Sequence, residues 1–73
     1  MQRYRNSLSG IYSYEIGFDW IKIIFKSNTH IVYEYNYLVT GEVYVEKMKQ
    51  LAMLGKGLNT YINKYVKSKY IIR

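Results

Sequence analysis

Residues 10–37 read GIYSYEIGFDWIKIIFKSNTHIVYEYNY, a stretch rich in β-branched and aromatic residues that largely alternate with polar ones. A period of two places successive side chains on opposite faces of a strand, so it is typical of a half-buried sheet. We expect strands at about residues 10–18, 20–26 and 30–37. A tight turn at Asp19 would join the first two, and the small polar residues from Ser27 to Thr29 would join the last two. The stretch therefore predicts a three-stranded antiparallel meander.

The alternation also predicts which side chains lie on which face. The apolar sides of the three strands are expected to carry Tyr12, Tyr14, Ile16, Phe18, Ile21, Ile23, Phe25, Tyr33, Tyr35 and Tyr37. We expect the last three to line the core, because the helices that follow need a sheet face on which to pack. Trp20 falls on the side of the second strand opposite to Ile21. Its ring is either a partly exposed platform for stacking or protein contact, or a cover for Ile24 on a second buried face.

After Leu38 the period becomes helical. Thr40 is the expected N-cap, and Glu42 lies in the first turn, where the helix dipole favours a carboxylate. One apolar arc contains Tyr44, Val45, Met48, Leu51 and Ala52, while Glu46, Lys47, Lys49 and Gln50 fall outside it. The glycines at positions 55 and 57 favour a helix end near Leu54. The pattern predicts a helix at about residues 41–54.

A second, shorter helix is expected at about residues 60–67. Asn59 would cap it, and its apolar face would contain Tyr61, Ile62, Tyr65 and Val66, with Asn63, Lys64 and Lys67 on the outer face. Residues 68–73 are expected to be extended or irregular. The sequence thus predicts one α+β domain over residues 1–73, in which a three-stranded antiparallel meander is followed by two helices packed on one sheet face.

Length and composition limit the class of protein. A chain of 73 residues forms one small domain, and without cysteine it has neither disulfides nor thiolate metal sites. No apolar run approaches the roughly 18 residues of a membrane span, and the polar start MQRYRNS is unlike a secretory signal. We therefore expect a protein that is soluble, cytoplasmic and not associated with a membrane.

Positive charge is concentrated at the carboxyl end. Residues 55–73 contain no acidic side chain and carry most of the net charge of +6, through Lys56, Lys64, Lys67, Lys69 and Arg73. Such a field attracts any polyanion, whether a nucleic acid or an acidic protein surface. Lysine predominates over arginine, which suits point contacts with phosphates more than bidentate recognition of guanine. Any binding should therefore be weakly sequence-specific.

Residues 61–70 read YINKYVKSKY. They resemble the end of the KTSC domain, a small module named for its occurrence at the carboxyl end of some lysyl-tRNA synthetases, whose pattern is Tyr-Phe-Asn, two variable residues, Ile-Arg-Gly, a basic residue and Tyr. The spacing from Asn63 to Tyr70 is the same. The segment from Gly57 to Asn63 is two residues longer than in the family, so the family asparagine corresponds to either Asn63 or Asn59.

Further segments are similar to this family in the same order. Residues 17–19 (GFD) resemble its Gly-Tyr-Asp, and Ile21, Ile23 and Phe25 resemble its Leu-x-Val-x-Phe strand. Residues 32–35 (VYEY), 43–44 (VY) and 56–57 (KG) resemble its next strand, the start of its helix and the turn before its final helix. The resemblance implies a β-meander followed by helices and a nucleic-acid-binding role, and it implies no catalytic activity.

Two functions remain open from the sequence. The first is a non-enzymatic nucleic-acid-binding module that contacts phosphates through its basic carboxyl end, with Lys56, Lys64, Lys67, Lys69, Arg73 and Asn63 as binding residues and Trp20 as a further base or protein contact. The alternative is a protein-interaction module that binds and inhibits or adapts a larger partner, or associates with itself through a sheet edge. His30 is the only histidine and no carboxylates cluster, so we expect no catalysis, cofactor or metal.

Overall fold

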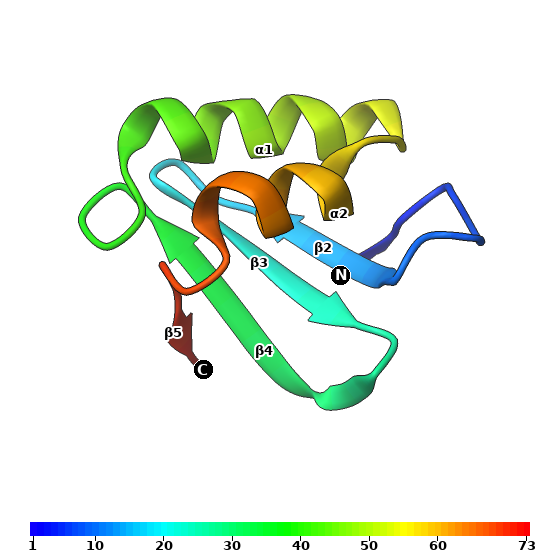
Figure 1. Cartoon of the computed structure of the whole chain (residues 1–73). Coiled ribbons are helices and arrows are strands. Elements are labelled where there is room, and N and C mark those ends of the chain that lie inside the picture. The colour runs from blue at the N-terminus through cyan, green and yellow to red at the C-terminus, as the bar shows by residue number, and fades with distance from the viewer.

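A computed structural model of residues 1–73 has one antiparallel sheet, and two helical segments cover a single face of it (Figure 1). The elements are β1 (Gln2–Arg3), β2 (Ile11–Ile16), β3 (Trp20–Phe25), β4 (Asn28–Asn36), α1 (Glu42–Leu54), α2 (Leu58–Tyr61), η1 (Ile62–Val66) and β5 (Ile71–Ile72). The strands follow one another across the sheet in chain order. The expected α+β class and the three central strands are confirmed, but the sheet has five strands, not three.

The two strands that the sequence did not predict are the edge strands. β1 pairs with β2 through Gln2 opposite Tyr14, and β5 pairs with β4 through Ile71 opposite Glu34. The Arg73 backbone N–H also donates to the Val32 carbonyl at 2.8 Å. Each edge strand is two residues long. A strand of that length has no periodicity to detect, and its pairing depends on the neighbouring strand.

The first expected apolar face is only partly correct. The register of β2 shifts between Ile11 and Ser13, and such a bulge changes the faces on which the flanking residues lie. Ile11 and Tyr14 are therefore both buried. Pairing ends at Ile16, and Phe18 in the following turn is 87 % exposed.

The apolar faces of β3 and β4 are as expected. Ile21 and Ile23 are completely buried, and Tyr35 is buried beside them. Phe25, Tyr33 and Tyr37 are partly buried and pack against the same core. The rings of β4 thus line the face that the helices cover.

Helix α1 packs on β3 and β4 through Val45, Met48 and Ala52, as its periodicity predicted. Its expected end is confirmed, because Gly55 adopts a left-handed conformation (φ 77°) directly after Leu54. The expected N-cap is wrong. Gly41 occupies that position, and the buried Thr40 hydroxyl instead accepts a bond from the Asn36 N–H at 3.1 Å and donates to the Lys69 carbonyl at 2.5 Å.

Lys49, which was expected to be outside the apolar arc, is only 9 % exposed. Its ammonium group donates to the Phe18 carbonyl at 2.6 Å and pairs with Glu46 at 2.8 Å. These partners compensate for the burial of the charge, because a lysine stem packs well along apolar surface when its head is satisfied. Helical periodicity cannot predict this burial, because the Phe18 carbonyl comes from a turn that is distant in sequence.

The second helical segment begins at Leu58, after Gly57 in a left-handed conformation (φ 83°), so Asn59 is not its cap. α2 continues directly into η1, a π-helical turn. The buried residues are spaced by four: Leu58, Ile62 and Val66. Tyr65, which was expected on the apolar face, is 45 % exposed. The core therefore needs fewer aromatic side chains from this segment than the sequence suggested.

The segment is joined to the rest of the core at both ends. The N–H of Leu58 donates to the Tyr4 hydroxyl at 3.3 Å, which links α2 to the buried side chain that follows β1. The hydroxyl of Thr40 holds the Lys69 carbonyl at the other end. No helix in the structure combines the length and the apolar character needed to cross a bilayer.

Candidate nucleic-acid interface

Four of the five basic residues singled out in the sequence are exposed and unpaired. The two ion pairs of the structure join Lys49 to Glu46 and Arg73 to Glu34, so neither involves the four lysines. Those four are Lys56, Lys64, Lys67 and Lys69. An approaching polyanion would find them without having to displace a carboxylate.

Three tyrosines lie beside two of these lysines. The ring centres of Tyr61 and Tyr65 are 4.8 Å apart, and Tyr44 of α1 lies 6.3 Å from Tyr65. The Lys64 ammonium is 5.4 Å from the centre of the Tyr65 ring, and the Lys69 ammonium is 5.4 Å from that of Tyr44. We call Tyr44, Tyr61, Lys64, Tyr65 and Lys69 the tyrosine–lysine face.

Buried anchors fix this face in place. Leu58, Ile62 and Val66 hold the helical segment against the core, so Lys64 and Tyr65 project from a fixed turn. Lys69 is fixed by its backbone, because its N–H donates to the Val66 carbonyl at 2.9 Å and its own carbonyl accepts from Thr40. Burial also raises the pKa of the Tyr61 hydroxyl.

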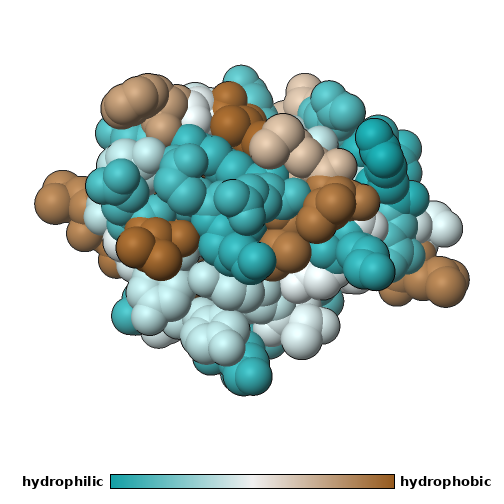
Figure 2. Space-filling view, turned by 90° about the horizontal axis from the view of Figure 1, so that it is seen from above, coloured by the Kyte–Doolittle hydropathy of each residue, from teal (hydrophilic) through white to brown (hydrophobic).

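The remaining lysines extend the positive surface in both directions. Lys67 directly follows η1, and Lys56 lies in the turn between α1 and α2, at the other end of the segment. Asn63 is exposed within η1. Over the helices, hydrophilic side chains cover the middle of the surface and hydrophobic ones form separate groups around them (Figure 2).

Arg73 does not join this surface. Its guanidinium donates to both Glu34 carboxylate oxygens, at 3.0 and 3.4 Å, where β5 pairs with β4. This bond, with a second from the Asn36 amide, holds the pKa of the Glu34 carboxyl below its ordinary value despite burial. Arg73 therefore neutralises a buried carboxylate, and to bind a phosphate, as the sequence predicted, it would have to share its guanidinium with Glu34.

The Glu34 pair leads to a prediction about pH. Because the folded-state pKa is lowered, the carboxylate stabilises the fold fully above its ordinary pKa of 4.5, and this contribution is lost as the pH falls through the lowered value. We expect the melting temperature of the wild type to fall more steeply on acidification than that of Glu34→Gln. Circular dichroism melts across a pH series measure this. Parallel curves of melting temperature against pH for the two proteins would contradict this prediction. Both proteins keep some acid sensitivity from Glu46, because Lys49 lowers the pKa of that carboxyl as well.

Trp20 lies on the sheet face that the helices leave uncovered. It is half-buried, with the Lys22 ammonium 4.6 Å from its ring centre. The ring packs over Gly17, where a β-carbon would lie only 2.0 Å from it. The structure thus separates Trp20 from the tyrosine–lysine face.

His30 is exposed on β4, and no three histidine or acidic side chains gather into a metal-binding group.

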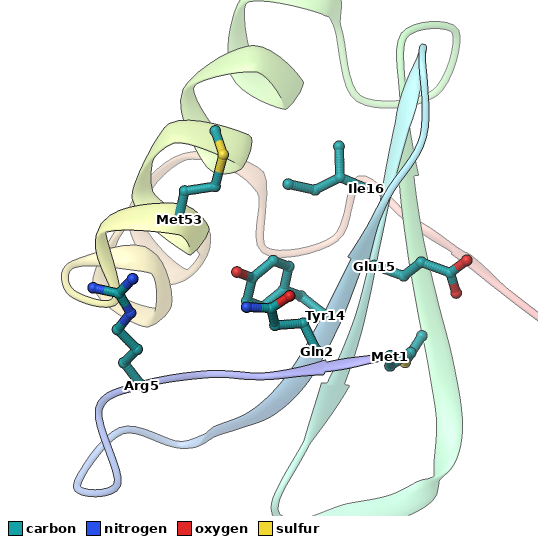
Figure 3. A pocket seen from close by; sticks show the side chains of 7 residues that line it. All are labelled: Met1, Gln2, Arg5, Tyr14, Glu15, Ile16 and Met53. Carbon is teal, nitrogen blue, oxygen red and sulfur yellow. The ribbon is translucent and has the colours of Figure 1, made fainter.

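An open groove of about 700 Å³ lies between the first two strands and the end of α1. It is lined by Met1, Gln2, Arg5, Tyr14, Glu15, Ile16 and Met53. Tyr14, Ile16 and Met53 face one another across it, whereas Glu15 points away (Figure 3). Sequence reasoning did not find it. The only hint in the sequence was Met53, an apolar residue that falls outside the apolar arc of its helix.

The candidate interface combines free lysines with one exposed and two partly buried tyrosine rings, and its parts come from α1, the turn after it, α2, η1 and the residues after η1. The lysines were identified by their position in the sequence, and the rings were brought to them by the packing of η1 against α1. Compared with known proteins, the chain matches no family model, no curated protein and no solved structure at a significant level.

Proposed function

We propose that this protein is a small, non-enzymatic nucleic-acid-binding module that contacts phosphates through its basic carboxyl-terminal helical segment. The observation that carries the proposal is that Lys56, Lys64, Lys67 and Lys69 are all exposed and unpaired, on a segment anchored in the core. Contacts with phosphates release condensed counterions without breaking any existing ion pair. The resemblance to KTSC domains, which we retain as part of the proposal, implies the same role.

The salt dependence of binding follows from the number of free lysines. Arg73 is committed to Glu34, so four contacts remain. Each neutralised phosphate contributes about −0.9 on duplex DNA and about −0.7 on a single strand to the slope of log K against log salt concentration. We therefore expect a slope between about −3 and −4. A slope near zero would contradict binding through phosphates.

Charge reversal tests the location of the interface. Fluorescence polarisation with short labelled RNA and DNA at low salt should show binding by the wild type, at least about tenfold weaker binding by Lys64→Glu/Lys67→Glu, and a slope about two units shallower. Arg3→Glu/Lys26→Glu is the matched control, because it makes the same change in net charge away from the helical segment. No binding at low salt, or equal loss in both variants, would overturn the proposal.

A second candidate function, protein interaction, has its own observation. Phe18, at 87 % exposure, lies two residues before Trp20, in the turn between β2 and β3, and the sheet face bearing Trp20 has no helix over it. Exposed aromatic rings are frequent anchors of protein contacts. In a pulldown, loss of a partner with Trp20→Ala but not with Lys64→Glu/Lys67→Glu would favour this function. The reverse result would favour a polyanion.

A further inference from the structure

We propose that the tyrosine–lysine face selects single-stranded over double-stranded nucleic acid, by stacking a base on Tyr65 while Lys64 contacts a neighbouring phosphate. This inference rests on the proposed nucleic-acid-binding function and adds the class of substrate. It depends on three features of the face: an exposed ring, a rigid support for that ring, and adjacent free charge.

The exposed ring is Tyr65. The core contacts of its segment are made by Leu58, Ile62 and Val66, so the Tyr65 side chain is not needed to bury the helix. It nevertheless projects a large aromatic surface that is 45 % exposed. It also lies in a π-helical turn, a rare element that is often found at functional sites.

The support comes from two neighbouring rings. Tyr61 lies 4.8 Å from Tyr65 within the same segment, and Tyr44 lies 6.3 Å away on α1, inclined by only 30° to it. Both are partly buried against the core. Contacts with these two rings restrict the orientations of Tyr65 before any ligand arrives, which lowers the entropic cost of stacking a base on it.

The adjacent charge comes from Lys64 and Lys69, which lie near the ring centres of Tyr65 and Tyr44 and form no ion pair. Lysine has a flexible stem, so Lys64 can leave the ring for a phosphate and leave a ring face open to a base. Stacking of a base on an aromatic side chain is worth about 1–3 kcal/mol and tolerates any base.

Selectivity follows from what each form of nucleic acid can offer this face. The bases of a duplex are already paired and stacked, so only its phosphates reach Lys64 and Lys69. An unpaired strand offers both phosphates and base faces. The two lysines therefore add binding energy for either form, whereas stacking on Tyr65 adds binding energy for a single strand and none for a duplex.

The experiment measures binding of the wild type, Tyr65→Phe, Tyr65→Leu and Tyr65→Ala to one RNA strand, one DNA strand, the matching DNA duplex and an abasic strand of the same length. We expect the wild type and Tyr65→Phe to prefer both intact strands over the abasic one. Tyr65→Ala and Tyr65→Leu should bind the intact strands roughly 5- to 150-fold more weakly, with duplex binding within about twofold. Tyr65→Leu keeps an apolar side chain in place if Tyr65→Ala is unstable.

The two proposals fail in different ways. Loss of binding to strand and duplex alike with Lys64→Glu/Lys67→Glu supports phosphate contact, whatever happens at Tyr65. Equal affinity of the wild type for the intact and the abasic strand, or equal loss on strand and duplex in both Tyr65→Leu and Tyr65→Ala, would overturn the stacking proposal alone. Absence of binding to every probe would overturn both.

Discussion

Removal of residues 58–73 is expected to unfold the protein, and not merely to remove its basic residues. Leu58, Ile62 and Val66 are almost completely buried in the shared core. Burying a side chain of this kind contributes about 1.5–3 kcal/mol. The core of a domain this small rarely supplies more than about 3–5 kcal/mol of net stability. The loss of three such side chains, roughly 4.5–9 kcal/mol together, matches or exceeds that margin.

Circular dichroism and urea unfolding of the truncated and the full-length proteins measure this effect. Full-length Lys64→Glu/Lys67→Glu is the control for charge, and it should keep a cooperative transition because both side chains are exposed. A shorter truncation that removes residues 71–73 should also keep a transition, at a lower temperature, because it deletes only β5 and the Glu34 pair. A cooperative transition in the protein that ends at Gly57 would show that the segment is an appendage and not part of the core.

The central sheet could be predicted from the sequence because the alternation of apolar and other residues along each strand matches the alternation of buried and less buried side chains. Ile21 and Ile23 alternate with Trp20 and Lys22, and burial follows that alternation. The pattern fails where pairing changes it. The bulge in β2 allows both Ile11 and Tyr14 to be buried, although they are three positions apart. The identity of Tyr12, at the bulge, does not indicate this shift. Register is a property of two strands, so one strand cannot reveal it.

The helical errors have the same origin. Thr40 has the chemistry of an N-cap, but its hydroxyl oxygen accepts from the Asn36 N–H and its O–H donates to the Lys69 carbonyl instead. Lys49 has the charge of a surface residue, but the Phe18 carbonyl provides a partner inside. The local pattern predicted Thr40 at the N-cap and Lys49 outside the apolar arc. Tertiary contacts decided which partners they found.

The candidate site divides in the same way. The excess of lysines in residues 55–73 is visible in the composition, and helical phasing predicted the exposure of Lys64 and Lys67. Arg73 could not be separated from the others, because its pairing with Glu34 depends on β5 joining the sheet. The aromatic half of the site required η1 to pack beside α1, which brings Tyr44 to Tyr65 across a separation of 21 positions. The positive charge of this segment could therefore be predicted from its composition. The grouping of lysines with tyrosine rings could be found only from the packing of η1 against α1.

The turn that sets the direction of the second helical segment leads to the other large prediction. Gly55 and Gly57 both adopt left-handed conformations, with φ of 77° and 83°. An alanine at either position incurs backbone strain of about 1–2 kcal/mol. The two sites differ in space: a β-carbon at Gly55 would lie 2.8 Å from the Arg5 β-carbon, whereas at Gly57 the nearest atom is 3.7 Å away, on Leu51. We expect Gly57→Ala to lose about 1 kcal/mol of unfolding free energy and Gly55→Ala about 2–4 kcal/mol.

Thermal melts resolve this difference, because 1 kcal/mol shifts the melting temperature of a domain this size by about 4–8 °C. The pair is informative because the strain is nearly the same and cancels in the comparison. Equal losses would mean that the chain near Arg5 moves away at no cost, so that the segment after β1 is not packed firmly on the end of α1. A larger loss at Gly55 would show that this segment restrains the turn. The position of Lys56, and with it one end of the proposed phosphate-binding surface, would then depend on the first five residues of the chain.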